Sequence, residues 1–150
     1  MSDATLLQTI NKMDASSNEM SIRPEKIVDS KLQIHKYCVP YLNEEKIYIL
    51  VIINATTNQV WVWIGSQEAP TFKYLSIAMQ SRLSPTPICT SVIGHSSMGL
   101  PSISSSIAER LTMKFKRVFI VSYNLKEDQD GQLQLFAEKN VFDIFKKLLN

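Results

Sequence analysis

The chain has 150 residues, of which 45% are hydrophobic and 20% are charged, and its 16 Lys and Arg exceed its 14 Asp and Glu by only two. This composition is typical of one globular domain, and the small charge argues against a chain that acts mainly on phosphates or on an acidic membrane surface. The longest apolar run, residues 47–53, is far shorter than the roughly 20 residues of a membrane-spanning helix. We therefore expect neither nucleic acid nor a membrane as a partner.

The cysteines and histidines do not predict a metal site. Cys38 and Cys89 are too few for a disulfide framework or a four-ligand zinc site. His35 and His95 are the only imidazoles, and their spacing does not complete a set of metal ligands. The sequence predicts two buried thiols in a reducing compartment, and no metal or other cofactor.

The first 30 residues differ from the rest of the chain. They carry three basic and five acidic residues and no aromatic residue, whereas residues 31–150 have a net charge of +4. A short helical pattern at residues 5–13 is marginal for an isolated helix in water. The segment also lacks the features of a signal peptide or a typical mitochondrial presequence. We predict a flexible acidic tail over residues 1–30 and a single folded domain over residues 31–150.

Deletion of residues 1–30 is therefore expected to leave the unfolding midpoint of the domain nearly unchanged. Urea denaturation of the full chain and of the shortened chain measures this. A fall in the free energy of unfolding of more than about 2 kcal/mol, the size of a typical core defect, would show that the tail packs on the domain.

Six segments have the alternating or β-branched pattern of strands. They are residues 32–39, 47–53, 60–64, 88–93, 118–124 and 133–137. The polar residues 54–58 predict a hairpin loop between the second and third of these strands.

Three segments have apolar residues at helical spacing, namely residues 70–83, 103–115 and 141–149. In the second of these, Ser106 and Glu109 have the spacing of a capping box, so regular helix is expected to begin only at Ser106. The order β-β-β-α-β-α-β-β-α predicts an α+β domain built on a six-stranded, mostly antiparallel sheet.

Several strands are apolar on both faces. A sheet with one solvated face alternates apolar and polar residues, yet residues 47–53, 60–64 and 118–121 are apolar throughout. Three helices can cover one face of six strands, but hardly two. We therefore expect the second face to pack on a like-folded partner chain, on which the domain depends for its solubility.

Trp61 and Trp63 project to the same face of their strand, opposite to Val60, Val62 and Ile64. Two interpretations of the tryptophans stay open, namely packing in the core and contact with a protein partner. The alternation of side chains along a strand does not by itself decide which side of residues 47–53 lies beside the tryptophans. The predicted partner surface consists of Tyr48, Leu50, Ile52, Trp61, Trp63, Phe119 and Val121.

The segment Gly94-His95-Ser96-Ser97-Met98-Gly99 lies between a predicted strand and a predicted helix, which is the context of a phosphate-binding loop or a nucleophile elbow. A phosphate-binding loop needs Lys and then Ser or Thr after its second glycine, where this chain has Leu100 and Pro101. The elbow needs glycine two residues after the nucleophilic serine, where Met98 stands. We expect no catalytic residues and no enzymatic activity; substitution of Ser96 by Ala would test the alternative.

Five segments carry a family resemblance. They are Val60-Trp61-Val62-Trp63-Ile64-Gly65, Leu75-Ser76-Ile77-Ala78-Met79, Pro87-Ile88-Cys89-Thr90-Ser91-Val92-Ile93-Gly94, Ile107-Ala108-Glu109-Arg110-Leu111 and Val118-Phe119-Ile120-Val121-Ser122-Tyr123-Asn124-Leu125. In order and spacing they resemble the proteasome assembly chaperone 4 family over roughly residues 32–145, and the last segment is the most distinctive.

The resemblance implies a small non-catalytic chaperone of the cytosol and nucleus. Members of this family are expected to form a heterodimer, sheet to sheet, with the sister protein proteasome assembly chaperone 3. The pair would promote assembly of the α ring of the proteasome core particle, with the fifth α subunit as the expected contact. The alternative from another class is a non-catalytic scaffold for a small GTPase, of the roadblock or longin type, which also combines a small sheet with few helices.

Overall fold

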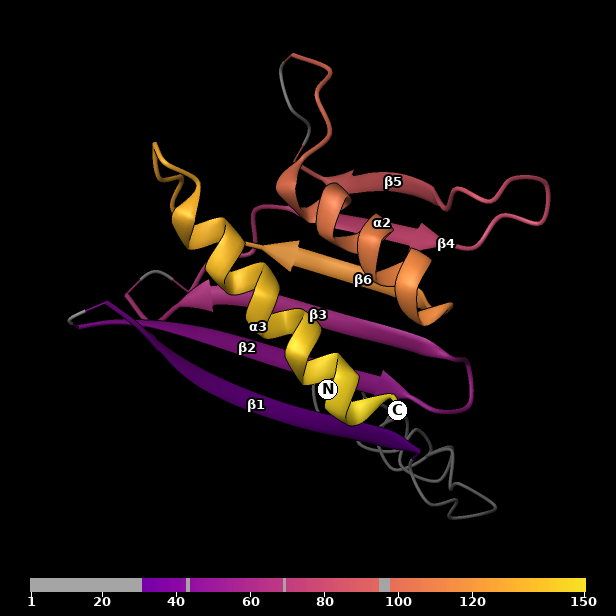
Figure 1. Cartoon of the computed structure of the whole chain (residues 1–150), viewed down its shortest axis with the longest axis horizontal. Helices are drawn as coiled ribbons and strands as arrows, with labels where there is room; N and C mark the ends of the chain where they lie inside the picture. Colours follow the sequence, from indigo (N-terminus) through magenta and orange to yellow (C-terminus); the bar gives the residue numbers. More distant parts are fainter. Residues whose placement is uncertain (1–30, 43, 69, 95–97) are drawn as a thin grey trace, which may run out of the picture. The chain divides into compact units, whose positions relative to one another are not determined.

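A computed structural model describes residues 31–42, 44–68, 70–94 and 98–150 (Figure 1). The predicted acidic tail, residues 1–30, lies outside the described residues. The elements are, in chain order, β1 (Leu32–Tyr41), β2 (Glu45–Asn54), β3 (Gln59–Ser66), β4 (Leu75–Met79), β5 (Ile88–Ile93), α2 (Ile103–Phe115), β6 (Val118–Tyr123) and α3 (Gln132–Leu148). The described part of the chain is thus an α+β fold with six strands and two helices.

The six strands form one mixed sheet in the order β1-β2-β3-β6-β4-β5. The strands β1, β2 and β3 form an antiparallel meander, and β4 pairs antiparallel with both β5 and β6. The one parallel pair joins β3 and β6 at the centre, because the chain reaches β6 only after building the far edge of the sheet and helix α2. The sheet has six strands, as predicted, although β4 is one of them in place of the predicted strand at residues 133–137, and all pairs but the β3–β6 pair are antiparallel.

Both helices lie on the same face of the sheet, as Figure 1 shows. Helix α2 begins at Ile103, not at Ser106 as the capping-box spacing predicted. The hydroxyl of Ser102 already accepts a hydrogen bond from the backbone N–H of Ser105, at 3.1 Å, and so caps the helix one turn earlier. At the other end Lys116 takes the left-handed conformation, with φ of 58°, and closes the helix.

The predicted helix at residues 70–83 is wrong, because its centre forms strand β4. Ser76 and Ala78 are fully buried towards the helices and alternate with the more exposed Ile77 and Met79, which is the period of a strand. The backbone of β4 pairs with β5 on one side and with β6 on the other. Tertiary pairing therefore outweighs the helical spacing of the apolar residues.

The predicted strand at residues 133–137 is also wrong, because it forms the first turns of α3. The alternation of Leu133 and Leu135 suggested a strand, but Leu135 is 58% exposed and only Leu133 is buried. The backbone N–H of Leu133 donates to the carboxylate of Asp128 at 2.9 Å, which supplies an acceptor for the first turn. The predicted last strand and last helix are thus one helix. Because residues 70–83 form strand β4 and not a helix, the described part of the chain has two helices instead of the predicted three.

The hydrophobic core lies between the sheet and the two helices. Strands β2, β3 and β6 contribute alternate residues to it, and α2 and α3 contribute one apolar stripe each. Its main members are Ile47, Ile49, Val51, Ile53, Val60, Val62, Ile64, Ile107, Leu111, Phe119, Val121, Tyr123, Leu133, Val141 and Phe145. Among the described residues, no helix is long and apolar enough to cross a membrane.

Candidate partner-binding face

Neither helix covers the second face of the sheet, which we call the open face. It is formed by the strand positions that alternate with the core residues. Its principal residues are Ile34, Lys36 and Cys38 of β1, Lys46, Tyr48, Leu50 and Ile52 of β2, Trp61 and Trp63 of β3, Ile120 and Ser122 of β6, Ile77 and Met79 of β4, and Ile88 and Thr90 of β5.

An apolar row crosses the whole open face. The strand registers place its members directly opposite one another, in the order Ile34, Ile52, Trp61, Ile120 and Ile77, and the polar Thr90 of β5 ends the row. Ile34 is 60% exposed and Trp61 is 43% exposed, whereas Ile120, which lies between Trp61 and Ile77, is buried. An apolar row of this kind on a face without a helix is typical of a protein contact surface.

The register also places the residues predicted for the partner surface. Leu50 lies opposite Trp63 and Ile52 lies opposite Trp61, so one side of β2 stands beside the tryptophans, together with Tyr48. The alternation of residues within β2 could not show which side lies beside the tryptophans, because it does not specify the register between β2 and β3.

Phe119 and Val121 do not belong to the open face, and their prediction as partner contacts is corrected. They lie opposite Val60 and Val62 in the β3–β6 pair and are fully buried beneath the helices. Residues directly opposite in neighbouring strands share a face, and Val60 and Val62 are core residues. Ile120, which lies between the two in the sequence, is the β6 residue that joins the open face.

The two tryptophans differ in their surroundings. The indole N–H of Trp63 donates to the backbone oxygen of Thr71 at 3.0 Å, and its ring lies over Gly65. Trp63 therefore fastens the segment after β3 to the sheet, whereas the exposed Trp61 is available for a partner. Packing within the chain thus explains Trp63, and a contact surface fits Trp61.

Replacement of Gly65 by Ala is expected to displace the Trp63 ring, since an added Cβ would lie 2.3 Å from a ring carbon. The displacement would break the hydrogen bond to Thr71, and we expect a loss of about 1–3 kcal/mol in the free energy of unfolding. Urea denaturation followed by tryptophan emission measures the loss. Unchanged stability and emission would show that the ring does not need its place over Gly65.

The predicted burial of both thiols is wrong for Cys38. Cys38 is exposed and lies opposite Tyr48 on the open face, because β1 is an edge strand with no helix on this side. Cys89 is half-buried on the helix side, where its thiol contacts the backbone oxygen of Ser105 at 3.5 Å. Burial raises the pKa of Cys89 above the ordinary value of a thiol, so its reactive thiolate form is rarer.

Cys38 is accordingly expected to react faster than Cys89 with iodoacetamide at neutral pH. Mass spectrometry of peptides from a timed alkylation series measures the two rates, with the Cys89→Ala variant as the control that isolates Cys38. Faster alkylation of Cys89 would contradict the burial described above.

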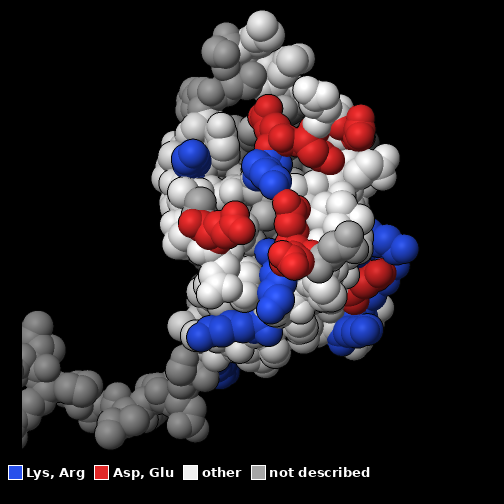
Figure 2. All heavy atoms as spheres, turned by 90° about the vertical axis from the view of Figure 1, so that its left-hand side faces the viewer, with Lys and Arg blue, Asp and Glu red and all other residues white. Residues whose placement is uncertain are grey.

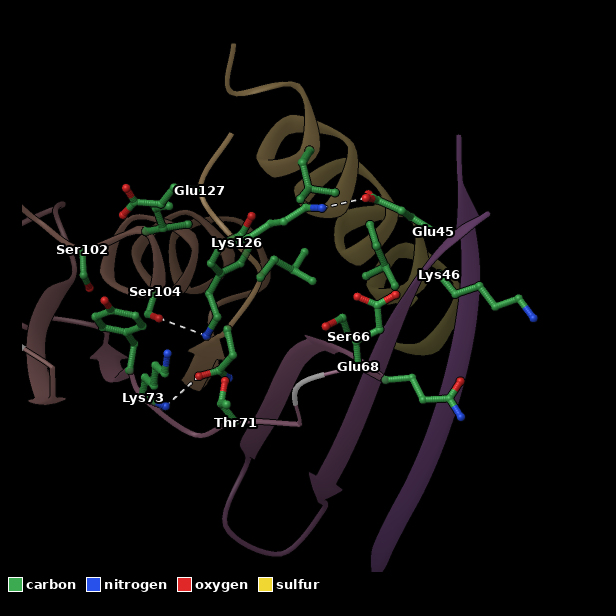
Figure 3. Close-up of a pocket in the computed structure, with 18 of the residues that line it drawn as sticks. Glu45, Lys46, Ser66, Glu68, Thr71, Lys73, Ser102, Ser104, Lys126 and Glu127 are labelled. Carbon is green, nitrogen blue, oxygen red and sulfur yellow. Dashed lines mark hydrogen bonds and ion pairs between the residues drawn. The ribbon is translucent and has the colours of Figure 1, made fainter. Parts of the chain in front are cut away.

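A cleft of about 1000 Å³ lies where strands β3 and β6 end and helix α2 begins (Figure 3). The ammonium of Lys126 contacts the carboxylate of Glu45 across it at 2.7 Å, and Glu68, Lys73 and further charged residues lie around it. Figure 2 shows acidic and basic side chains intermingled on this side of the molecule. The surface around the cleft therefore does not carry charge of one sign only. The described residues contain no group of His, Cys, Asp and Glu that could hold a metal ion.

The hydroxyl groups near α2 serve the fold. Ser76, Ser91, Ser102 and Ser105 form a hydrogen-bonded network with oxygen–oxygen distances between 2.9 and 3.4 Å. The one described imidazole, that of His35, lies in β1 at the opposite edge of the sheet, so it cannot activate a serine of this network. The loop residues His95 and Ser96 lie outside the described residues.

Comparison with known proteins supplies the family. Residues 46–125 match the family model described as proteasome assembly chaperone 4. The mouse proteasome assembly chaperone 4 is 30% identical over 113 residues, which are 75% of this chain and 85% of the mouse protein. The human proteasome assembly chaperone 4 is 32% identical over 85 residues, which are 57% of this chain and 64% of the human protein.

A solved structure supports the fold. One chain in the crystal structure of a chaperone complex for yeast 20S proteasome assembly superposes with a TM-score of 0.64 and 12% sequence identity, over 80% of this chain and 99% of the yeast chain. At this identity the match concerns the fold alone. The family model and the mouse protein lead to one conclusion: the chain belongs to the proteasome assembly chaperone 4 family.

Proposed function

We propose that the chain is a non-catalytic chaperone that pairs with proteasome assembly chaperone 3 and promotes assembly of the α ring of the proteasome core particle. The α subunits, with the fifth as the expected contact, are the chains on which the pair acts, in the cytosol and the nucleus. Membership of the family supports this function over the small-GTPase scaffold. The likeness to a chain from an assembly-chaperone complex supports a fold that works within a complex.

The observation that carries the proposal is the apolar row across the open face. Six strands spaced about 4.8 Å apart make a face roughly 24 Å wide. A second sheet packs at about 10 Å from the first, so a like-folded partner would bring its own side chains between Ile34, Ile52 and Trp61. A standard interface buries roughly 800 Å² per partner, which a face of this width and the length of its strands supplies.

Binding alone is sufficient for such a function. A chaperone of this kind holds subunits in a productive arrangement and makes or breaks no covalent bond. The described serine hydroxyls near α2 are engaged with one another, and the ammonium of Lys126 is paired with Glu45. The chemistry of the described residues thus suits a surface that recognises other chains.

Affinity purification of the full chain, followed by mass spectrometry of what copurifies, tests the proposal. We expect proteasome assembly chaperone 3 and α subunits, without the subunits that complete the core particle. Recovery of a small GTPase in their place would contradict the proposal. The Trp61→Asp variant is the matched control, because it alters the open face and should recover neither protein.

A further inference from the structure

The open face has an uneven charge. Lys36 and Lys46 are the only charged residues at the open-face positions of the described strands, and none of these positions holds Asp or Glu. Lys36 lies opposite Leu50, whose other neighbour is Trp63. Lys46 borders the cleft, and in Figure 3 its side chain extends outward, away from Glu45, which precedes it in β2.

Neither lysine is neutralised within the part of the chain that the structure describes. The ion pairs there join Arg110 to Glu138, Lys126 to Glu45 and Lys146 to Asp143. Of these, Glu45 is the nearest in sequence, and it is already engaged on the cleft side of β2. The two ammonium groups of the open face are thus available for carboxylates of another chain.

The charge has different consequences for two kinds of pairing. Two copies of this chain packed open face to open face would gather four lysines and no carboxylate from these strands, whichever way the strands were aligned. Like charges and unpaired ammonium groups in an interface weaken association, whereas opposite charges strengthen it and fix the partner. The face therefore favours a different chain over a second copy.

We propose that Lys36 and Lys46 select a partner whose facing sheet presents carboxylates, and that they disfavour pairing between two copies of this chain. The inference rests on the proposed function, because it takes the open face as the partner surface. The aliphatic stems of the lysines still add apolar area beside Leu50, so only their ammonium groups require a carboxylate.

The double variant Lys36→Met, Lys46→Met tests the proposal, since methionine keeps most of the stem and removes the charge. We expect its affinity for proteasome assembly chaperone 3 to fall about tenfold or more, as for truncation of one partner of an interfacial charge pair. We expect its self-association to rise by a similar factor. Sedimentation velocity of the full chain, alone and mixed with chaperone 3, measures both quantities.

Two control variants accompany it. Lys36→Arg, Lys46→Arg keeps both charges and should change neither quantity by more than about twofold. Lys139→Met removes an exposed charge from α3, on the helix side of the sheet, and should also leave the affinity for chaperone 3 and the self-association unchanged. Raising the salt concentration should weaken the complex of the wild-type chain more than that of the methionine variant.

The decisive result is that the double methionine variant loses affinity for chaperone 3 and gains self-association. A variant that loses both kinds of association would show damage to the face and would overturn the proposal. A rise in self-association without loss of affinity for chaperone 3 would also overturn it, because the lysines would then oppose self-pairing without selecting the partner. Failure of the wild-type chain to bind chaperone 3 would overturn the proposed function as well, whereas normal binding by all variants would overturn this inference alone.

Discussion

Replacement of Trp61 by Asp is expected to abolish association with proteasome assembly chaperone 3 and to leave the domain folded. Trp61 lies in the middle of the apolar row, between Ile52 and Ile120, and is 43% exposed in the isolated chain. Tryptophans in such central positions carry a large share of interface energy, and a buried unpaired carboxylate adds a penalty of its own. We expect an affinity at least about 1000-fold lower, which corresponds to about 4 kcal/mol.

Isothermal titration with chaperone 3 measures the affinity, and urea denaturation of each variant confirms the fold. Trp61→Phe is the matched control, because it keeps an aromatic ring and should retain most of the affinity. Binding by the Asp variant as tight as that of the wild-type chain would place the partner surface elsewhere.

Replacement of Phe119 by Ala is expected to destabilise the domain by about 3–5 kcal/mol. The Phe119 side chain is fully buried, and its ring centroid lies 5.1 Å from that of Phe145 and 6.2 Å from that of Phe115. Removal of the ring leaves a cavity between the sheet and both helices. Because domains are stable by about 5–15 kcal/mol, much of the stability would be lost.

Urea denaturation of the Phe119→Ala variant gives this cost directly. Met113→Ala, on the exposed side of α2, is the control and should change the stability by less than about 1 kcal/mol. A Phe119 variant with wild-type stability that fails to bind chaperone 3 would return Phe119 to the partner surface.

The sequence predicted the sheet and its second apolar face because strands β2 and β3 contain short runs of β-branched and aromatic residues that are apolar at every position. Residues at every position of β2 are apolar between Ile47 and Ile53, and the structure places one set under the helices and the other on the open face. Local patterns did not distinguish β4 from a helix, since Leu75, Ala78 and Met79 also fit helical spacing. The pairing of β4 with strands on both sides, which no local pattern contains, decides its conformation.

The partner surface was only partly predictable for the same reason. Trp61 and Trp63 were found from their spacing, but Ile34, Ile77 and Ile120 were missed, because only the register of six strands aligns them with Trp61. Phe119 was assigned to the wrong face because β6 is apolar at successive positions. The sequence of β6 therefore does not show which of its residues face the helices. A parallel partner strand that arrives after a helical crossover leaves no local sign of its register.

The open face is expected to bind the partner, and the tryptophans of the chain allow a direct test. Its only two tryptophans, Trp61 and Trp63, both lie on this face. The full chain labelled with 5-fluorotryptophan should give two fluorine resonances in NMR, which the Trp61→Phe variant assigns. On addition of unlabelled proteasome assembly chaperone 3, we predict that the Trp61 resonance shifts and saturates at one equivalent. A complex confirmed by sedimentation in which the Trp61 resonance does not move would show that the partner binds elsewhere than on the open face.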